Sequence, residues 1–356
     1  MSPINYGRPP DFDEIEVTLF GPGYGEAVAV HLGEGSWILV DSCIDPSAKA
    51  SASGCYLDQL GVDSAAVKVI LASHWHDDHV RGISELAKKF PSAEFALSAI
   101  FNKSEAQAFL AAFGGSAAGK LTKGTKELFA VIEDRDSCAP TMHKTIVFEA
   151  ELNGRRVAVT ALSPLPHAHA QSIAYLAQFL PNSGSAINNA PELRPNFEAV
   201  SLHIDFGDDA VLLGADLEEH DALGWSAIVA HAWSGSRRPA SAYKVAHHGS
   251  VTGHCTGVWG TLLQDYSVAC MTPFTLGRQR LPTADDISRI KSHTPDAYVT
   301  SVGSVKAEMD DRILKRLKSI CVSVTRADSS FGAIRLRRKI GAPEWSKELF
   351  GAAKKL

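Results

Sequence analysis

The chain has 356 residues, 45% of them hydrophobic, and contains no apolar run near the about 18 to 20 residues that a membrane span requires. Its formal net charge of −5 and its pI near 6.3 exclude a globally basic nucleic-acid-binding protein and leave room only for a local basic cleft. This composition predicts a globular protein of one large domain or two small ones.

The N-terminal residues are polar and acidic, and they lack the charged segment followed by an apolar core that marks a signal peptide. The six cysteines are dispersed through the sequence without a close pair. We therefore expect reduced thiols, a cytoplasmic location and no association with a membrane.

Three short strands are predicted near the start of the chain. Residues 15–19 alternate as a half-buried strand does, and residues 27–32 and 37–40 follow after glycine-rich turns, so the pattern predicts a β-meander. Asp41 comes directly after the third strand. It is either an ordinary turn carboxylate or a hydrogen-bonding partner of metal ligands. The end of a helix is predicted at residues 56–60.

The stretch with the strongest chemical signal begins with residues 67–72, whose β-branched and aliphatic side chains predict a buried strand. Four residues of ligand type follow with the spacing H-x-H-x-D-H: His74, His76, Asp78 and His79. Imidazole and carboxylate together are the ligands that borderline-soft divalent metals prefer. Apolar residues then recur at helical spacing up to Phe90, and Pro91 ends the pattern. The sequence predicts a metal centre on a strand-to-helix turn.

The middle of the chain predicts a strand at residues 94–97, a helix at 104–113 and a loop or insertion at 114–126. Strands are expected again at residues 145–148 and 156–162. His167 and His169 follow the second of these, where each is either one more ligand or a structural histidine. The next thirty residues, which are rich in Pro, Asn and Ser around residues 187–195, predict a long loop.

Two further ligand types appear at predicted strand ends in the second half. Residues 200–206 and 210–213 predict a hairpin that ends in Gly214-Ala215-Asp216, and a strand at 243–246 ends in His247-His248-Gly249-Ser250. Folds of the α/β type place ligand-binding groups at such strand ends. We therefore expect a carboxylate and an imidazole from this half to join the first four residues.

The phrases HWHDDH, GAD and HHGS, in this order behind FGPGYGEAVAVHLGEGSWILVDS, resemble the metallo-β-lactamase superfamily of metallohydrolases. Within it they are most similar to the hydrolase domain of the ComEC-type competence proteins. The resemblance runs from about Glu16 to about Lys339. It implies a four-layer αβ/βα sandwich of the α/β (α+β) class, as a single domain over residues 1–356 with its core at about 14–340, and a two-metal site at one edge.

The resemblance also implies the role of each site residue. His74 and His76 would bind a first metal, Asp216 would bridge, and the second metal would be bound by Asp78, His79 and His247. The third histidine of the first metal stays open among His167, His169 and His203. The expected cofactor is zinc, as two ions, with manganese as an alternative. Asp78 and His248 are the catalytic candidates, and His248 either contacts the substrate oxyanion or leaving group or is a packed histidine.

The predicted function is a dinuclear metal-dependent hydrolase, a phosphodiesterase or nuclease that works through a metal-bridging hydroxide. Its partner would be a nucleic acid or a small phosphodiester. Alternatives are a lactonase or thioester hydrolase, and a non-catalytic module of the same fold in a multi-protein assembly, although no protein partner is identified. Basic residues cluster at Arg237 and Arg238, at Arg278 and Arg280, and at residues 335–339, either as a phosphate track or as solvated faces.

Overall fold

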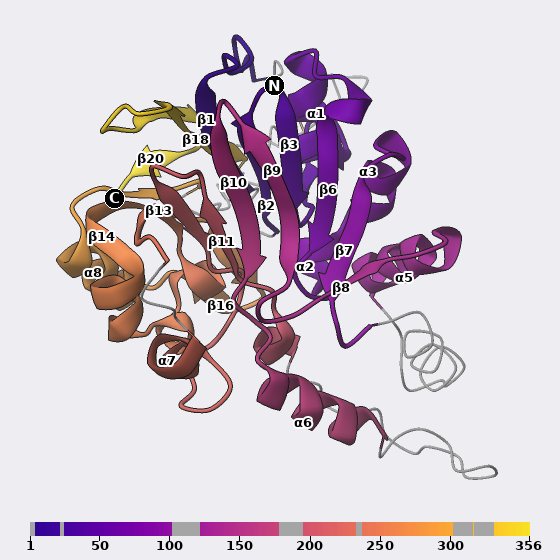
Figure 1. Cartoon of the computed structure of the whole chain (residues 1–356), viewed down its shortest axis with the longest axis vertical. Coiled ribbons are helices and arrows are strands. Elements are labelled where there is room, and N and C mark those ends of the chain that lie inside the picture. Colours follow the sequence, from indigo (N-terminus) through magenta and orange to yellow (C-terminus); the bar gives the residue numbers. More distant parts are fainter. Residues whose placement is uncertain are drawn as a thin grey trace.

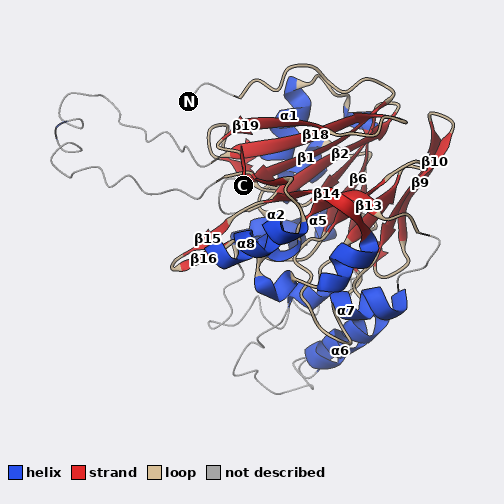
Figure 2. Ribbon diagram, turned by 90° about the vertical axis from the view of Figure 1, so that its left-hand side faces the viewer, coloured by secondary structure: helices blue, strands red, loops and turns tan. Residues whose placement is uncertain are grey.

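The computed structural model describes residues 4–21, 25–101, 122–177, 195–232, 237–301, 316 and 331–356. Two mixed sheets of eight strands each lie face to face, with helices on the outer sides (Figures 1 and 2). The predicted helix at residues 104–113 lies outside the described residues. So do most of the two predicted loops.

The first sheet is built mainly from the N-terminal half. Its strand order is β19 (Ser346–Gly351), β18 (Gly332–Lys339), β1 (Glu14–Gly21), β2 (Ala27–Gly33), β3 (Ser36–Val40), β6 (Val67–Ala72), β7 (Glu94–Ser98) and β8 (Ala139–Thr141). Strands β19 to β3 pair antiparallel, and β3, β6, β7 and β8 pair parallel.

The second sheet repeats this plan. Its order is β20 (Lys354–Lys355), β17 (Ala297–Val299), β14 (Leu263–Met271), β13 (Ala240–Lys244), β12 (Ala210–Leu213), β11 (Leu202–Asp205), β10 (Arg155–Ala161) and β9 (Ile146–Leu152). Strands β9 to β12 form an antiparallel meander, and β12, β13, β14 and β17 are parallel. The C-terminal residues add β19 to one sheet and β20 to the other, so they extend both sheets beyond the expected core at 14–340.

The alternation of side chains along each strand separates the layers. In β2, for example, Val28 and Val30 face the second sheet, whereas Ala27 and Ala29 face the outer helices. The helices over the first sheet are α1 (Ala52–Gln59), α3 (Ile83–Lys89) and α5 (Lys123–Asp134), and those over the second include α7 (Trp225–Ala227) and α8 (Ala284–His293). Three apolar layers between four layers of structure confirm the predicted αβ/βα sandwich.

Most predicted strands are confirmed with ends shifted by one or two residues, although β9 ends four residues later than predicted and β13 begins three residues earlier. Strand β1 differs in burial, because it is covered on both faces instead of half-buried. Its outer face carries Glu16 and Thr18, which are buried because Tyr56 of α1 and Arg337 of β18 bind to Glu16. A polar residue in the pattern therefore marked an internal ion pair and not a solvent-exposed face.

The helix predicted after the H-x-H-x-D-H motif is divided in two. Helix α2 (Asp77–Val80) ends at Arg81, and α3 begins after Gly82, whose φ of +87° a side chain would strain. Two more helices replace predicted loop: α5 begins at Lys123 with Thr122 as its N-cap, and α6 (Pro166–Ala177) begins just before His167. Among the described residues, no helix has the length and apolar character needed to cross a lipid bilayer.

Candidate metal centre

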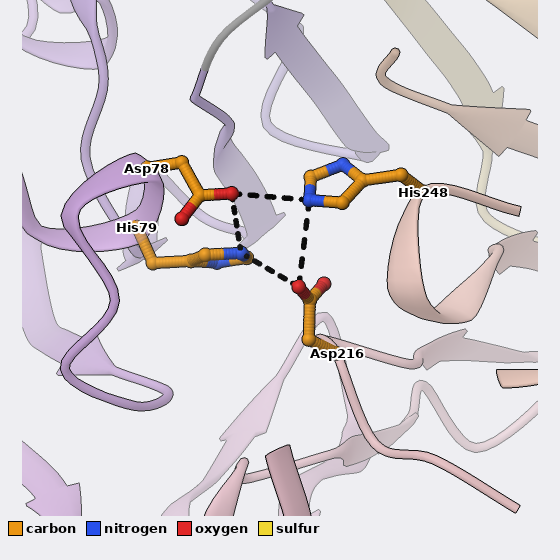
Figure 3. Close-up of side chains that lie close together, drawn as sticks. All are labelled: Asp78, His79, Asp216 and His248. Atoms are coloured by element: carbon orange, nitrogen blue, oxygen red, sulfur yellow. Dashed lines mark hydrogen bonds and ion pairs between the residues drawn. The ribbon is translucent and has the colours of Figure 1, made fainter. Parts of the chain in front are cut away.

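The site residues lie where several parallel strands end. Strand β6 ends before the motif that continues into α2, strand β12 ends before Asp216, and strand β13 is followed by the short helical turn η4 (Ala246–Gly249). Figure 3 shows that side chains from these three segments converge on one point between the two sheets. The sequence motifs, far apart in the chain, are thus brought together.

Four side chains form the larger of two groups of ligand atoms that share Asp216. In Asp78, His79, Asp216 and His248, one ligand atom from each lies within 4.8 Å of the others, and all four residues are buried. Asp216 Oδ2 lies 3.2 Å from His79 Nε2 and 3.4 Å from His248 Nε2. Asp78 Oδ2 lies 3.2 Å from His248 Nε2. Two imidazoles and two carboxylates around one point match the ligand number and type of a zinc site.

A second group shares Asp216. It contains His74, His76 and Asp216, again with ligand atoms within 4.8 Å. His79 Nε2 and Asp216 Oδ1 are buried and have no hydrogen-bond partner among the described residues. A buried polar atom without a partner is costly, so atoms of this kind are expected where an ion binds. The residues present therefore fit two ions that share Asp216.

The backbone around the site is strained. Four non-glycine residues have left-handed backbone conformations there: Asp41 (φ 60°), Ala215 (φ 44°), His247 (φ 47°) and His248 (φ 52°). Such conformations cost about 1 to 3 kcal/mol each and persist only where the surroundings hold them. The amide of His247 donates to the carbonyl of Ala215 over 2.9 Å, which links two of these turns.

The structure reverses the positions expected for His247 and His248. His248 points into the larger group. His247, expected there as a ligand, is part-exposed at the rim, with Nδ1 2.7 Å from Thr252 Oγ1 and Nε2 3.4 Å from Asn196 Nδ2. The consecutive left-handed residues turn the chain after β13, so the second imidazole faces inward instead of the first.

None of the three histidines left open for the first metal joins His74 and His76 in a ligand group of the described residues. His167 is exposed on α6, 3.0 Å from Gln171 Nε2. His169 Nδ1 lies 3.8 Å from Glu198 Oε2, and His203 Nε2 lies 2.8 Å from the carbonyl oxygen of Arg238. The group of His74, His76 and Asp216 thus has three ligand residues, and the group that contains His248 has four.

A sequence comparison agrees with this architecture. Residues 20–113 match the model of the metallo-beta-lactamase superfamily. This match covers the H-x-H-x-D-H motif and the first strands, in a chain whose two sheets and outer helices form an αβ/βα sandwich. The chain has the metallo-beta-lactamase fold.

Solved structures with this fold are only distantly similar. YhfI from Bacillus subtilis is 14% identical, with 82% of this chain and 97% of that chain covered and a TM-score of 0.38. A metallo-beta-lactamase with the HARLDQ motif from Cronobacter sakazakii is 18% identical with a TM-score of 0.33, and the match covers 56% of this chain and 61% of that one. MEM-A1, a subclass B3 metallo-beta-lactamase from a soil metagenome, is 16% identical with a TM-score of 0.34, over 74% and 80% of the two chains. No curated protein sequence matches significantly.

Asp41 holds the imidazole of one candidate ligand, His79. Its Oδ2 accepts a hydrogen bond from His79 Nδ1 over 2.8 Å, and the amide and hydroxyl of Ser73 donate to its two oxygens over 2.7 and 2.8 Å. This leaves His79 Nε2 facing the site, as in the carboxylate–histidine pairs that orient metal ligands. Of the two alternatives for Asp41, the structure supports the partner of a ligand.

Sequence reasoning missed a buried ion pair behind the ligands. Lys244 of β13 contacts Glu26, which directly precedes β2, and its Nζ also donates to the carbonyl of Ala215 over 2.8 Å. The hydroxyl of Thr272 donates to Glu26 as well. Lys244 interrupts an apolar strand just before HHGS, and this break in the pattern is the signal that could have revealed it.

Glu26 reaches both ligand imidazoles. Its carboxylate oxygens lie 3.7 Å from His79 Nδ1 and 3.6 Å from His248 Nδ1. Burial by itself lowers the pKa of Lys244, yet Glu26 and Asp216 raise it above its ordinary value, so the ammonium stays charged. The ion pair thus joins the first sheet to the second directly behind the ligands.

The charges of the ligands are strongly perturbed. Burial lowers the pKa of His248, but Asp216 and Asp78 raise it to about 10, and the carboxylates around His79 hold its pKa well above the ordinary value in spite of burial. Burial holds the pKa of His74 well below its usual range. Protons would therefore compete with metal ions for Nε2 of His79 and His248.

Proposed function

We propose that this protein is a dinuclear metal-dependent hydrolase of phosphodiesters. The observation that carries the proposal is the sharing of Asp216 by two groups of ligand atoms, with buried Nε2 and Oδ1 atoms that lack hydrogen-bond partners in the described structure. Sites with two neighbouring ions are typical of phosphatases and nucleases. A non-catalytic module would have no need to keep such costly buried atoms.

His74, His76 and Asp216 would hold one ion, and Asp78, His79, Asp216 and His248 the other. Nitrogen and carboxylate ligands without cysteine favour zinc, with manganese as the alternative. When bound, the ions would lower the pKa of a coordinated water and take up charge from the attacked oxygen. Asp41 would orient the imidazole of His79 through its hydrogen bond, and Glu26 would add negative charge beside His79 and His248. We assign to His247, at the rim, the role expected earlier for His248: it would hydrogen-bond or protonate the substrate.

The charges at the site favour an anionic substrate. Glu26, Asp41, Asp78 and Asp216 are buried carboxylates. The buried ammonium of Lys244 contacts two of them, Glu26 and Asp216. Two divalent cations would offset the excess negative charge, so that an anionic diester can approach. The likeness of HHGS and GAD to the ComEC-type hydrolase domains also favours phosphodiesters over lactams or lactones. The net charge of −5 favours a small or single-stranded substrate over long duplex DNA.

The test is a panel of hydrolysis assays on chelated protein that has been reconstituted with zinc or manganese. The substrates are bis(4-nitrophenyl) phosphate, single-stranded DNA, single-stranded RNA and a lactone. We expect metal-dependent hydrolysis of the diesters and two ions per chain by elemental analysis. Asp216→Ala should fold and lose activity. Hydrolysis of the lactone alone, or full activity without a transition metal, would refute the proposal.

A further inference from the structure

A small hairpin projects from the body of the protein next to the candidate metal centre. Strands β15 (Phe274–Leu276) and β16 (Gln279–Leu281) pair only with each other, and Gly277 and Arg278 form the turn between them. Figure 2 shows the hairpin standing out from the sandwich beside α8. Neither strand extends a sheet, so the hairpin contributes little to the two cores.

Both ends of the hairpin contact the HHGS turn. Thr272 precedes β15 by two residues. Its carbonyl oxygen lies 3.3 Å from His248 Nδ1, and its Oγ1 lies 3.1 Å from the same atom. The ring of Phe274 stacks on the imidazole of His248, with centroids 5.2 Å apart and planes inclined by 30°. At the other end, Pro282 directly follows β16 and lies against Gly249: a Cβ added to this glycine would be 3.4 Å from Pro282 Cβ. The hairpin is thus anchored on the residue that completes the larger group of ligand atoms.

The hairpin carries two exposed arginines, Arg278 in the turn and Arg280 opposite Thr275. Arg278 and Arg280 are exposed, and neither has an ion pair within the part of the chain that the structure describes. The other basic clusters differ. Arg335 and Arg337 are buried in ion pairs with Glu348 and Glu16. Of the basic residues singled out from the sequence, those of the hairpin combine exposure with nearness to the site.

We propose that the β15–β16 hairpin is a substrate-binding arm, on which Arg278 and Arg280 bind phosphates of a single-stranded nucleic acid whose scissile diester lies at the metal centre. The proposal rests on the proposed function. A strand rises about 3.3 Å per residue, so Arg278 in the turn lies roughly 10 Å beyond Phe274, within reach of a phosphate next to the scissile one. Arg280 lies opposite Thr275, nearer the base of the hairpin. Positive charge beside an aromatic side chain is the usual composition of single-strand binding surfaces.

The test compares a long and a short substrate. Arg278→Ala/Arg280→Ala removes both charges, and Arg156→Ala removes an exposed arginine from the β9–β10 hairpin instead. The probes are a fluorescein-labelled oligothymidylate of about 12 nucleotides, within the usual size of single-strand sites, and bis(4-nitrophenyl) phosphate. We expect the double variant to lose at least about tenfold in kcat/KM on the oligonucleotide, since each charge-assisted hydrogen bond is worth more than about 1.4 kcal/mol. The small diester should be cleaved within about twofold of the wild-type rate.

Direct binding gives a readout that does not depend on hydrolysis. The salt dependence of oligonucleotide affinity, measured by fluorescence anisotropy, should become shallower by about 1.4 in the double variant, because each single-strand phosphate contact contributes about 0.7 to the slope. Arg278→Lys/Arg280→Lys should restore the slope. Arg156→Ala should not change it.

The outcomes separate this proposal from the proposed function. If the wild type cleaves both substrates and the double variant cleaves and binds the oligonucleotide equally well, the substrate-binding role of the hairpin is refuted. The proposed hydrolase activity is then still supported. If no diester is cleaved but the double variant loses oligonucleotide affinity, the arm is supported and the hydrolase refuted. The wild type could instead bind an oligoglutamate peptide more tightly than the oligonucleotide, with this peptide binding lost in the double variant. That result would assign the arm to an acidic protein partner and overturn the proposal.

Discussion

Adjacent histidines with opposite orientations give the sharpest test at the scale of single residues. His248→Ala should remove one of the two ions, because its Nε2 lies within 3.4 Å of both Asp78 and Asp216. His247→Ala should keep both ions and lower kcat by about 10² to 10⁴, the usual contribution of a general acid or oxyanion donor. Elemental analysis and steady-state kinetics on the same preparations give the two readouts.

His231→Ala serves as the control, since His231 is exposed and lies outside the candidate site. A His247→Ala protein that loses an ion while His248→Ala keeps both would restore the assignment made from the sequence. If His247 acts as a general acid, His247→Ala should slow hydrolysis of a substrate with a nitrophenolate leaving group less than it slows hydrolysis of a nucleotide diester.

His31 should make stability depend on pH. The buried ring accepts a hydrogen bond at Nε2 from the Gly35 amide over 3.0 Å and donates from Nδ1 to the Glu14 carbonyl over 2.8 Å, so it is neutral. Burial lowers its pKa to about 4. Between about pH 6.5 and 4 the unfolded chain takes up a proton that the folded chain does not. The free energy of unfolding should therefore fall as the pH falls through this window, by up to about 3 kcal/mol.

The measurement is urea unfolding of chelated protein at several pH values in the wild type and in His31→Gln. The variant should lose this part of the pH dependence, and His231→Gln should keep it. Parallel pH profiles in the wild type and His31→Gln would show that His31 is not the titrating group.

At the scale of elements, the approach of β12 to β13 depends on a glycine. A Cβ on Gly214 would lie 2.9 Å from the N, Cα and Cβ atoms of Ala246, which is closer than side chains normally come. Gly214→Ala should therefore push apart the two turns that carry Asp216 and His248. We expect a loss of about 1 to 3 kcal/mol in the free energy of unfolding, together with weaker metal binding.

Gly260→Ala is the matched control, because a Cβ there meets nothing within 4 Å. Chemical denaturation gives the stability, and competition with a metal indicator gives the affinity. Unchanged metal affinity in a destabilised Gly214→Ala protein would mean that the two turns move together and not apart.

At the scale of the whole molecule, the ion pair between Glu26 and Lys244 joins the two sheets. Lys244→Met leaves Glu26 buried without its cation, which should cost about 3 to 5 kcal/mol of unfolding free energy in metal-free protein. Lys244→Met/Glu26→Gln should regain most of this loss, because the buried charge is then absent. Guanidinium unfolding of the single and double variants measures the coupling.

The exposed pair of Lys339 and Asp13, 3.8 Å apart, provides the comparison: Lys339→Met should cost no more than about 1 kcal/mol. If the double variant is as unstable as Lys244→Met alone, Lys244 acts through its contact with the Ala215 carbonyl and not through Glu26.

The sequence by itself determined the strands and the ligand types. Short apolar runs predict β2, β3 and β6, because one side of each strand meets the other sheet and the opposite side meets the helices. The spacing of His74, His76, Asp78 and His79 predicts a metal centre in the same way. These signals are local, since periodicity and ligand spacing are properties of consecutive residues.

Only the tertiary structure decided which groups meet. The pairing of Glu26 with Lys244 joins residues from two sheets, and no local pattern states that two distant side chains share one buried site. The choice of His248 over His247 follows from left-handed backbone that the packing of η4 against neighbouring segments holds in place. A turn of this kind changes the direction of each side chain in succession, so one residue of difference in the sequence decides between a ligand and a group at the rim.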